Sequence, residues 1–406
     1  MRLTHLSLTD FRNFSRLDLA VPAEVVLVSG SNAQGKTSLL EAIYYLATFT
    51  SFHADSDRQL INFLAARSSL AVARIVGELE RAGTSHRIEV RLIQEANQLN
   101  TTSLRKEVLV DGVKCKINEA IGQFNAVLFL PQSCRIIEGA PEDRRRYLNL
   151  ALAQVISFYP AALSDYNKAL TQRNALLKQL NERGGDPLQL EFWDGQLAIS
   201  GAQLIHARIA AVQEMERLAA RVHSQLTNHN EVLRFSYQPS YDPMLRPTKQ
   251  IVLPLDAPLD RSGLTLEHIR QGFLEALGRL RKEEIARGVT TIGPHRDELR
   301  FLSNGIDLET YGSRGQVRTA VLALKLAEVA WMQQKTGHWP VLLLDEVLAE
   351  LDQQRRKDLL SRLSGLQQSL LTTTDLKLFE PQFVEQAALW QVQGGRVEKI
   401  ENRQSD

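Results

Sequence analysis

Cysteine is scarce in this sequence, where only Cys115 and Cys134 occur among 406 residues. Neither lies in a C-x-x-C pair or beside a group of histidines, so we expect two reduced thiols and no disulfide scaffold or structural zinc site. Long apolar runs are missing too. The run 341–344 is far too short to span a bilayer, and the first residues, MRLTHLSLTDF, are interrupted by polar side chains. We therefore expect a cytoplasmic protein without a signal peptide or a membrane segment.

An excess of charge of either sign is also absent. The chain has 48 Lys and Arg residues against 47 Asp and Glu residues, which gives a formal net charge of +1. This balance neither requires nor excludes a nucleic-acid partner, because a basic stripe can be offset by acidic surface elsewhere. With 44% hydrophobic residues, the chain is long enough for two or three domains with sizeable cores.

The stretch 24–43, EVVLVSGSNAQGKTSLLEAI, contains a pattern typical of phosphate binding. The pattern G-x-x-x-x-G-K-[ST] runs from Gly30 to Thr37; in it, backbone N–H groups surround phosphate oxygens, the lysine reaches the terminal phosphates and the hydroxyl reaches Mg²⁺. The β-branched run 25–28 predicts a buried strand, and residues 38–43 predict a helix whose N-terminus faces the phosphates. Strand, loop and helix follow in the order that an ATP site requires.

A second apolar run, 341–344, predicts a buried parallel strand that ends in two carboxylates. Open α/β sheets bind ligands at the carboxyl ends of their strands. We therefore expect Asp345 to bind the Mg²⁺ that Thr37 also contacts, and Glu346 to accept a proton from the water that attacks the γ-phosphate. Glu346 and Lys36 are the predicted catalytic residues.

A third feature is YGSRGQ at 311–316, which precedes the apolar-periodic stretch VRTAVLALKLAEVAWMQQ. Serine and glycine at the start of a long helix present a hydroxyl and free backbone N–H groups, which can bind an anion. The segment lies just upstream of the strand that ends in Asp345 and Glu346. This position favours a nucleotide contact over a simple helix cap.

The pattern of the chain changes twice. Residues 1–135 are rich in predicted strands, 136–288 in long helices, and from 289 onward strands return with TTIGPHRDELRFL, followed by a helix from 316 to about 335. The stretch 236–263, with its prolines and aspartates, interrupts the helices as a loop or short extended segment. The two ends of the chain therefore belong to one domain, and 136–288 are a helical insert.

Together these features resemble an ABC-type ATPase head: a phosphate loop, S-x-G-Q before a long helix, a strand ending in Asp-Glu, and then Glu-Leu-Asp at 350–352. Further stretches are similar to the RecF family of bacterial recombination and replication-repair proteins. They are FRNF at 11–14, NAQGKTSLLEAIYYLA around the loop, PEDRRRYLN from 141, and IGPHRDEL from 292. The resemblance implies an α/β fold with a phosphate-loop core, a strand-rich N-terminal part (1–135), a helical insert (136–288) and a C-terminal part of the head (289–406).

The resemblance also implies site residues. It assigns the nucleotide loop to Gly30, Ser31, Asn32, Ala33, Gln34, Gly35, Lys36, Thr37 and Ser38, the signature to Ser313, Gly315 and Gln316, and a dimer-contacting loop to Asp352. Arg12 is expected to reach the nucleotide, and Gln132 corresponds to the metal-binding glutamine loop of ABC heads. Two positions depart from the pattern: Arg314 replaces the usual first glycine of the signature, and Thr374 and Asp375 stand where a switch histidine is expected.

By the same resemblance, the expected activity is a weak, DNA-stimulated ATPase that uses ATP and Mg²⁺. ATP would dimerise two heads on single-stranded, gapped or junction DNA, because a signature helix far from its own phosphate loop can cover a γ-phosphate only across a two-fold interface. RecR- and RecO-type mediators are the implied partners, and recombinase loading and SOS induction the implied processes.

Two other functions remain open. One is a DNA clamp that binds ATP without hydrolysing it, which the missing switch histidine favours. The other is the ATPase subunit of a membrane transporter, which the large helical insert disfavours. The insert is too short for the long coiled coil of structural-maintenance-of-chromosomes proteins. Candidate DNA contacts are Arg144 to Arg146 and a group of Arg279, Arg281, Lys282 and Arg287, although such charges can equally belong to solvated or packed helix faces.

Overall fold

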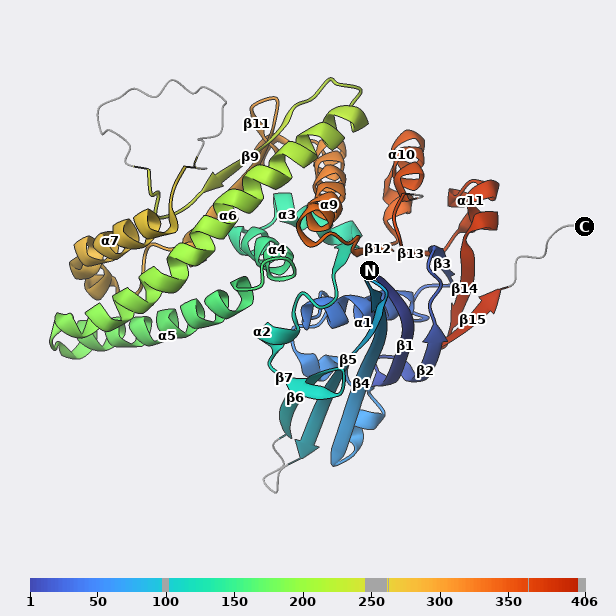
Figure 1. Cartoon of the computed structure of the whole chain (residues 1–406), viewed down its shortest axis with the longest axis horizontal. Coiled ribbons are helices and arrows are strands. Elements are labelled where there is room, and N and C mark those ends of the chain that lie inside the picture. Colours follow the sequence, from blue (N-terminus) through green and yellow to red (C-terminus); the bar gives the residue numbers. More distant parts are fainter. Residues whose placement is uncertain (97–101, 245–260, 262, 364, 401–406) are drawn as a thin grey trace, which may run out of the picture. The chain divides into compact units, whose positions relative to one another are not determined.

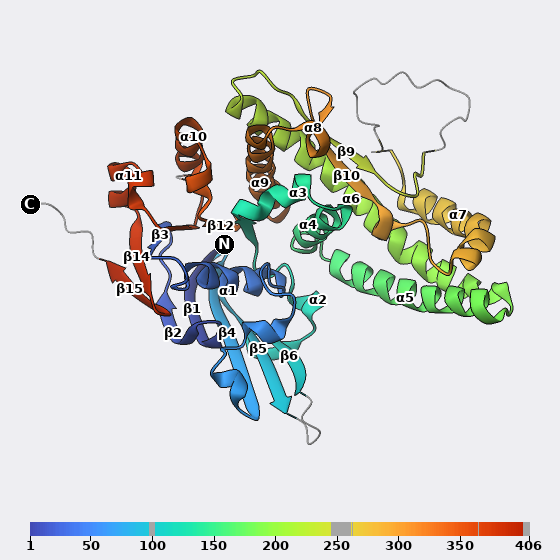
Figure 2. The same ribbon diagram turned by 180° about the vertical axis from the view of Figure 1, so that it is seen from behind.

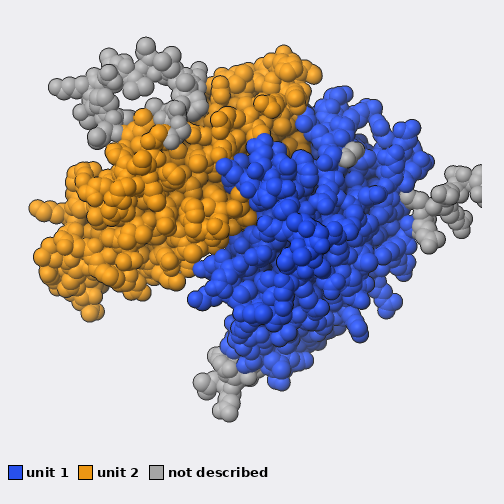
Figure 3. Space-filling model, viewed as in Figure 1, with its two compact units in different colours: residues 1–133, 328–406 blue, residues 134–327 orange. Residues whose placement is uncertain are grey.

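The computed structural model describes residues 1–96, 102–244, 261, 263–363 and 365–400. The chain divides into two compact units (Figure 3): the first unit comprises residues 1–133 and 328–406, and the second unit residues 134–327. The head thus includes both ends of the sequence. The second unit extends beyond residue 288, where the sequence placed the end of the helical insert. Residues 289–327 belong to this unit together with the helices that precede them. Of the stretch 236–263, residues 245–260 and 262 lie outside the described residues.

The first unit contains a six-stranded antiparallel sheet in the order β2-β1-β4-β5-β6-β7. Its tight hairpins follow local chemistry: Asp111 and Gly112 connect β6 to β7, both with positive φ (50° and 81°), as a two-residue turn requires. The strands are β1 (Arg2–Phe11), β2 (Phe14–Ala20), β4 (Leu70–Arg81), β5 (Thr84–Ala96), β6 (Thr102–Val110) and β7 (Val113–Cys115).

The second sheet of the first unit has the order β15-β14-β3-β13-β12-β8 and is parallel except for β15. Its strands are β3 (Val25–Ser29), β8 (Ala126–Phe129), β12 (Val341–Asp345), β13 (Ser369–Thr373), β14 (Ala388–Gln393) and β15 (Arg396–Ile400). Strands from both ends of the sequence therefore lie next to each other in one sheet, with β3 between β14 and β13 and with β8 beside β12. The carboxyl ends of β3 and β12 meet at the same edge, with only β13 between them.

Helix α1 (Lys36–Thr48) packs against strands of both sheets, and Figures 1 and 2 show it between them. Leu39, Leu40 and Ile43 are fully buried in the core that the two sheets share. The other helices lying wholly in this unit are α2 (Ile117–Ala120), α10 (Gln353–Leu363) and α11 (Pro381–Gln386). Burial of α1 on nearly all sides fixes the position of the phosphate loop that precedes it.

The second unit is mainly helical. Its long helices α5 and α6 pack side by side and α7 packs against α6 (Figure 1), with α6 using the apolar positions that the sequence predicts, including Leu197, Leu204 and Met215. The helices are α3 (Arg135–Glu138), α4 (Pro141–Ala153), α5 (Tyr159–Arg183), α6 (Leu190–Leu226), α7 (Leu266–Arg287), α8 (Leu308–Tyr311) and α9 (Arg314–Thr336), whose last turns belong to the first unit.

A three-stranded antiparallel sheet, β11-β10-β9, completes the second unit. Its strands are β9 (Leu233–Gln238), β10 (Glu298–Ser303) and β11 (Ile306–Asp307). The strand predicted in TTIGPHRDELRFL is β10, and it pairs with β9 instead of joining the sheets of the head. Within the described part of the chain, none of the helices combines the length and apolar composition needed to cross a membrane.

Candidate functional site

The phosphate loop connects β3 to α1 at the carboxyl edge of the mainly parallel sheet. Gly30 and Gly35 have φ values of 154° and 119°, and Ala33 is left-handed at 62°. A Cβ at Gly30 would lie 2.4 Å from the carbonyl oxygen of Val392 in β14, so only glycine fits there without displacing backbone. The loop therefore has the curled backbone that the motif predicts.

Lys36 is the first residue of α1 and its side chain is only 5% exposed. Its ammonium group donates to the carbonyl oxygens of Gly30 at 2.7 Å and Ser31 at 3.0 Å, and it forms an ion pair with Glu346 at 3.0 Å. The two residues predicted to be catalytic therefore contact each other. Glu346 follows β12 with a left-handed φ of 55°, and Thr374, at the expected switch position, lies 3.5 Å from its second carboxylate oxygen.

Asp345, the last residue of β12, lies beside the hydroxyl group of Thr37. The Thr37 Oγ1 atom is 3.0 Å and 2.9 Å from the two carboxylate oxygens of Asp345. Thr372 in β13 donates a further hydrogen bond to this carboxylate at 2.7 Å and accepts one from the backbone N–H of Glu346 at 3.0 Å. The neighbouring strand therefore orients both acidic residues.

Arg12 lies in the turn between β1 and β2 with a φ of 52°. Its guanidinium donates two hydrogen bonds to the buried carboxylate of Glu41 in α1, at 2.7 and 2.8 Å, and one to the carbonyl oxygen of Gln59 at 3.1 Å. A bidentate pair of this kind fixes the plane of the guanidinium.

These elements enclose a pocket of about 630 Å³ in the first unit. The predicted residues that line it are Arg12, Asn32, Ala33, Gly35, Lys36, Thr37, Ser38 and Glu346, and the others are Asn13, Gln59, Ile61, Asn62, Phe63 and Leu64. On the side away from the phosphate loop, Phe63 and Leu64, each 70% exposed, add apolar surface to the lining. Asn62 connects that side to the β1–β2 turn by donating to the carbonyl oxygen of Arg12 at 2.7 Å.

Two predicted residues of the first unit lie at the same sheet edge. Gln132 is exposed in the short 3₁₀ segment Pro131–Cys134 that follows β8, the strand next to β12. Asp352 precedes α10 and caps it by accepting a hydrogen bond from the backbone N–H of Arg355, which lowers the pKa of Asp352. Neither is among the described residues that line the pocket.

The predicted signature residues begin α9 in the second unit. Ser313 Oγ accepts from the backbone N–H of Gln316 at 3.2 Å, and the Gln316 side chain accepts from the backbone N–H of Ser313 at 3.1 Å. This reciprocal pair is a capping box. Gly315 is exposed on the first turn. The capping box thus fixes the start of the helix, whose N-terminal partial positive charge suits an anion.

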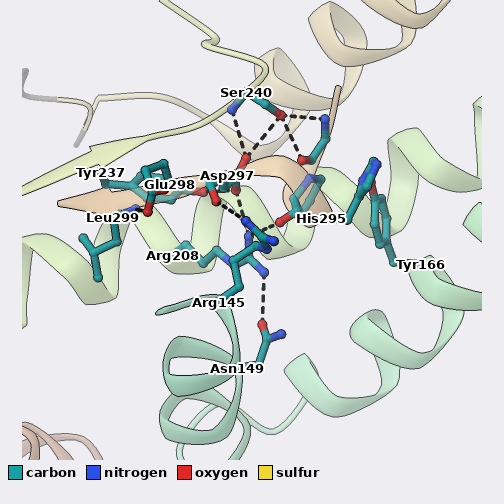
Figure 4. Close-up of polar contacts among 12 residues, drawn as sticks. Arg145, Asn149, Tyr166, Arg208, Tyr237, Ser240, His295, Asp297, Glu298 and Leu299 are labelled. Atoms are coloured by element: carbon teal, nitrogen blue, oxygen red, sulfur yellow. Dashed lines mark hydrogen bonds and ion pairs between the residues drawn. The ribbon is translucent and has the colours of Figure 1, made fainter. Parts of the chain in front are cut away.

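The GPHRDEL motif forms the centre of a polar network in the second unit (Figure 4). Buried Arg208 of α6 donates to Asp297 at 2.8 Å and to the carbonyl oxygen of Pro294 at 2.7 Å, and Tyr237 of β9 also donates to Asp297. His295 lies 2.7 Å from the hydroxyl of Tyr166 in α5, and its burial lowers its pKa to about 4. The motif therefore ties helices and sheet together.

Several candidate DNA contacts have other partners. Arg144 is 2% exposed and forms ion pairs with Glu298 at 2.6 Å and Glu309 at 3.2 Å, so burial excludes it from a direct DNA contact. Three arginines of α7 lie beside carboxylates: Arg279 by Glu275 at 4.0 Å, Arg281 by Asp194 at 3.0 Å and Arg287 by Glu283 at 2.9 Å. Lys282 is exposed. Ion pairs within the chain thus engage several of the arginines that the sequence offered as candidate DNA contacts.

The structure adds residues that were not assigned to the site from the sequence. Asn13 and Thr372 contact the loop residue Gln34 and the acid Asp345, respectively. Asn13 follows Arg12 in the FRNF stretch, so this stretch could have indicated Asn13 as a further site residue. Thr372 gave none, because a threonine at the end of an apolar strand is common.

Comparison with known proteins places the chain in a family. A profile described as RecF/RecN/SMC N terminal domain matches residues 2–395. The DNA replication and repair protein RecF of Roseiflexus castenholzii is 40% identical over 411 residues, which cover 98% of this chain and 99% of the relative. RecF of Chloroflexus aurantiacus is 39% identical over 408 residues, with the same coverage.

A solved structure shows the same fold. The recombination mediator protein RecF-ATP in the RecFOR pathway superimposes with a TM-score of 0.81 at 30% identity, covering 98% of this chain and 97% of that chain. These likenesses confirm the predicted resemblance and the predicted α/β ATPase-head fold. The chain belongs to the RecF family.

Proposed function

We propose that this chain is an ATP-dependent DNA-binding protein of DNA replication and recombinational repair. The observation that carries the proposal is the pocket of about 630 Å³ in which the curled loop, Lys36, Thr37 and Glu346 meet. Loop N–H groups and an ammonium suit a polyphosphate, and the apolar surface at Phe63 suits the rest of a nucleotide. Relatives named for DNA replication and repair, and a RecF structure named with ATP, support this assignment.

The residues present fit a bound Mg²⁺ ion. The Thr37 hydroxyl and the Asp345 carboxylate lie within 3.0 Å of each other beside the phosphate loop, and Mg²⁺ prefers such oxygen ligands together with phosphates. Gln132, exposed after the adjoining strand, is proposed as a further ligand. When bound, the ion would neutralise charge on the β- and γ-phosphates.

For hydrolysis, Glu346 is the proposed general base. It lines the pocket next to Lys36, which contacts its Oε1 atom, while its Oε2 atom lies 3.5 Å from the Thr374 hydroxyl. It would take the proton from the attacking water while Lys36 neutralises phosphate charge. We expect turnover to be slow, because Thr374 stands where a switch histidine is expected. Stimulation of turnover by DNA is proposed from the family resemblance.

The signature supports a dimer that closes on ATP. Ser313, Gly315 and Gln316 present an ordered helix start, and Asp352 presents an exposed carboxylate after β12. We propose that the three signature residues cover the γ-phosphate bound to a second copy of the chain, and that Asp352 belongs to a loop that contacts that copy. ATP would then bind the closed dimer better than the monomer and shift the population toward it.

The finer biological assignments follow from the family. We propose single-stranded, gapped or junction DNA as the ligand, RecR- and RecO-type mediators as partners, and the cytoplasm as the location. Within this scheme the chain would assist recombinase loading and SOS induction. Slow hydrolysis would release the dimer from DNA.

A clamp that binds ATP without hydrolysing it remains the second candidate. The specific observation in its favour is that Thr374, a residue unable to act as an imidazole would, lies beside Glu346. Turnover measured with and without DNA separates the two: phosphate release above background, lost in Glu346→Gln, supports the enzyme.

The proposed function is tested by light scattering coupled to gel filtration. The purified chain is run alone, with MgATP, with gapped DNA, and with both. We expect a monomer alone, a dimer with MgATP, and the largest DNA-bound fraction when both are present. If MgATP changes neither the elution volume nor the measured mass, with or without DNA, the proposal is contradicted.

A further inference from the structure

Two hairpin turns contact the phosphate loop at one residue, Gln34. The side-chain N–H of Asn13, in the β1–β2 turn, donates to the backbone carbonyl of Gln34 at 2.8 Å. The backbone N–H of Gly395, in the β14–β15 turn, donates to the same carbonyl at 3.1 Å. The backbone N–H of Gly394 donates to the Gln34 side chain at 2.7 Å. Three segments far apart in sequence therefore meet at the end of the loop that leads into α1.

The glycines at this junction tolerate little change. A Cβ at Gly395 would lie 2.3 Å from the carbonyl oxygen of Asn13, and a Cβ at Gly35 would lie 2.4 Å from the Asn13 side-chain nitrogen. A Cβ at Gly394, by contrast, would meet nothing within 4 Å. The β14–β15 turn is thus pressed against the β1–β2 turn at Gly395, while its other glycine faces open space.

We propose that Asn13 and Gly395 are positioning residues that keep the phosphate loop in its anion-binding shape. The affinity of the site for a polyphosphate then depends on the C-terminal hairpin. This inference rests on the proposed nucleotide function and adds to it a structural determinant, Gly395 in the β14–β15 turn, that is not among the described residues lining the pocket. Gly395 and Gln34 are not among the described residues that line the pocket, so their effect must pass through the loop backbone.

The physical reason lies in the carbonyl of Gln34. A loop whose N–H groups converge on a ligand has like dipoles crowded together, and it keeps this form only if other bonds hold its carbonyl groups. The Gln34 carbonyl accepts two such bonds from outside the loop. If they are lost, only a fraction of molecules has the competent loop, and the apparent Kd rises by the reciprocal of that fraction.

The test compares neighbouring glycines. Gly395→Ala forces a collision with the backbone of Asn13, whereas Gly394→Ala, which also has positive φ (55° against 72°), is the matched control. Kd is measured by calorimetry for MgATP and for inorganic tripolyphosphate. From the net worth of one neutral hydrogen bond, we expect Gly395→Ala to raise both Kd values by about 3- to 10-fold. Gly394→Ala should change them by less than about 2-fold.

Asn13→Ala provides a second route, because this exposed residue can be truncated without disturbing the core. It should raise both Kd values as Gly395→Ala does, and the double variant should show less than the product of the two effects, since both act on one carbonyl. A role confined to stability would lower the unfolding temperature and leave Kd unchanged at temperatures well below it.

The outcomes are distinguishable. If the wild-type chain binds neither MgATP nor tripolyphosphate, the proposed function fails. If it binds them and Gly395→Ala matches Gly394→Ala, or Asn13→Ala binds normally, the positioning role is overturned. Should Gly395→Ala fail to fold, the Asn13→Ala result decides.

Discussion

His295, in the GPHRDEL motif, should make the stability of the chain depend on pH. Its Nδ1 lies 2.7 Å from the hydroxyl of Tyr166 and its Nε2 lies 3.3 Å from the carbonyl oxygen of Thr290, which suits a neutral ring with a proton on Nε2. Burial is the main cause that lowers its pKa from 6.5 to about 4, and the nearby cations Arg296, Arg145 and Arg208 lower it further. The folded state therefore resists protonation.

The magnitude follows from that shift. In the unfolded chain the ring takes up a proton near pH 6.5, and in the folded chain only near pH 4. Between these values the unfolded state binds more protons, so stability falls as the pH falls. At about 1.4 kcal/mol per pKa unit, the loss from pH 7 to pH 4 approaches about 3 kcal/mol.

Urea unfolding at several pH values, followed for wild type and His295→Gln, measures this loss. As the pH falls from 7 to 4, the unfolding free energy of the wild type should fall by about 3 kcal/mol more than that of His295→Gln. His206→Gln, which removes an exposed histidine from α6, is the matched control and should keep the wild-type dependence. Parallel curves for wild type and His295→Gln would refute the assignment of a half-buried, neutral histidine.

Three substitutions test the proposed site. Lys36→Ala should weaken ATP binding and ATP-dependent DNA retention together, and unchanged ATP affinity would remove the loop from the argument. Ser313→Arg should bind ATP as a monomer but not dimerise, because its bulky cation would block the approach of the partner's nucleotide; a dimer seen by light scattering at the wild-type ATP concentration would contradict a shared site. Glu346→Gln should hydrolyse ATP about 10² to 10⁴ times more slowly while the dimer and its DNA persist longer. Wild-type turnover, or loss of the dimer, would contradict the role of Glu346 as base.

Local chemistry made much of the fold and site predictable. The run 25–28, the loop and α1 are adjacent in sequence, and each has a pattern that few structures other than a phosphate site satisfy. The strand before Asp345 is equally local. Its partnership with Thr37 could be inferred because Asp345 ends one parallel strand and the loop that leads to Thr37 follows another, and ligands bind at such carboxyl ends.

Other features depend on pairings between distant residues, which one sequence does not reveal. Arg144 was a candidate DNA contact until Glu298, far along the chain, proved to be its partner. The strand in GPHRDEL was predicted, but its pairing with β9 in a separate sheet was not. Asn13 and Gly395 meet only because two hairpin turns come together, and neither turn alone indicates a contact with the phosphate loop.

The strand order of the mainly parallel sheet has a consequence for synthesis. Strand β3, which leads into the phosphate loop, pairs on both sides with strands made very late: β13 from Ser369 and β14 from Ala388. At about 5–20 residues per second, the ribosome needs about 20 to 70 s after Ser29 before the first of these partners exists. A nascent chain thus carries the complete phosphate-loop sequence long before it has the strands that shape it. Nucleotide can therefore assist folding only late in translation, and a chain terminated before Ser369 would expose β3 to chaperones and proteases as an unpaired apolar strand.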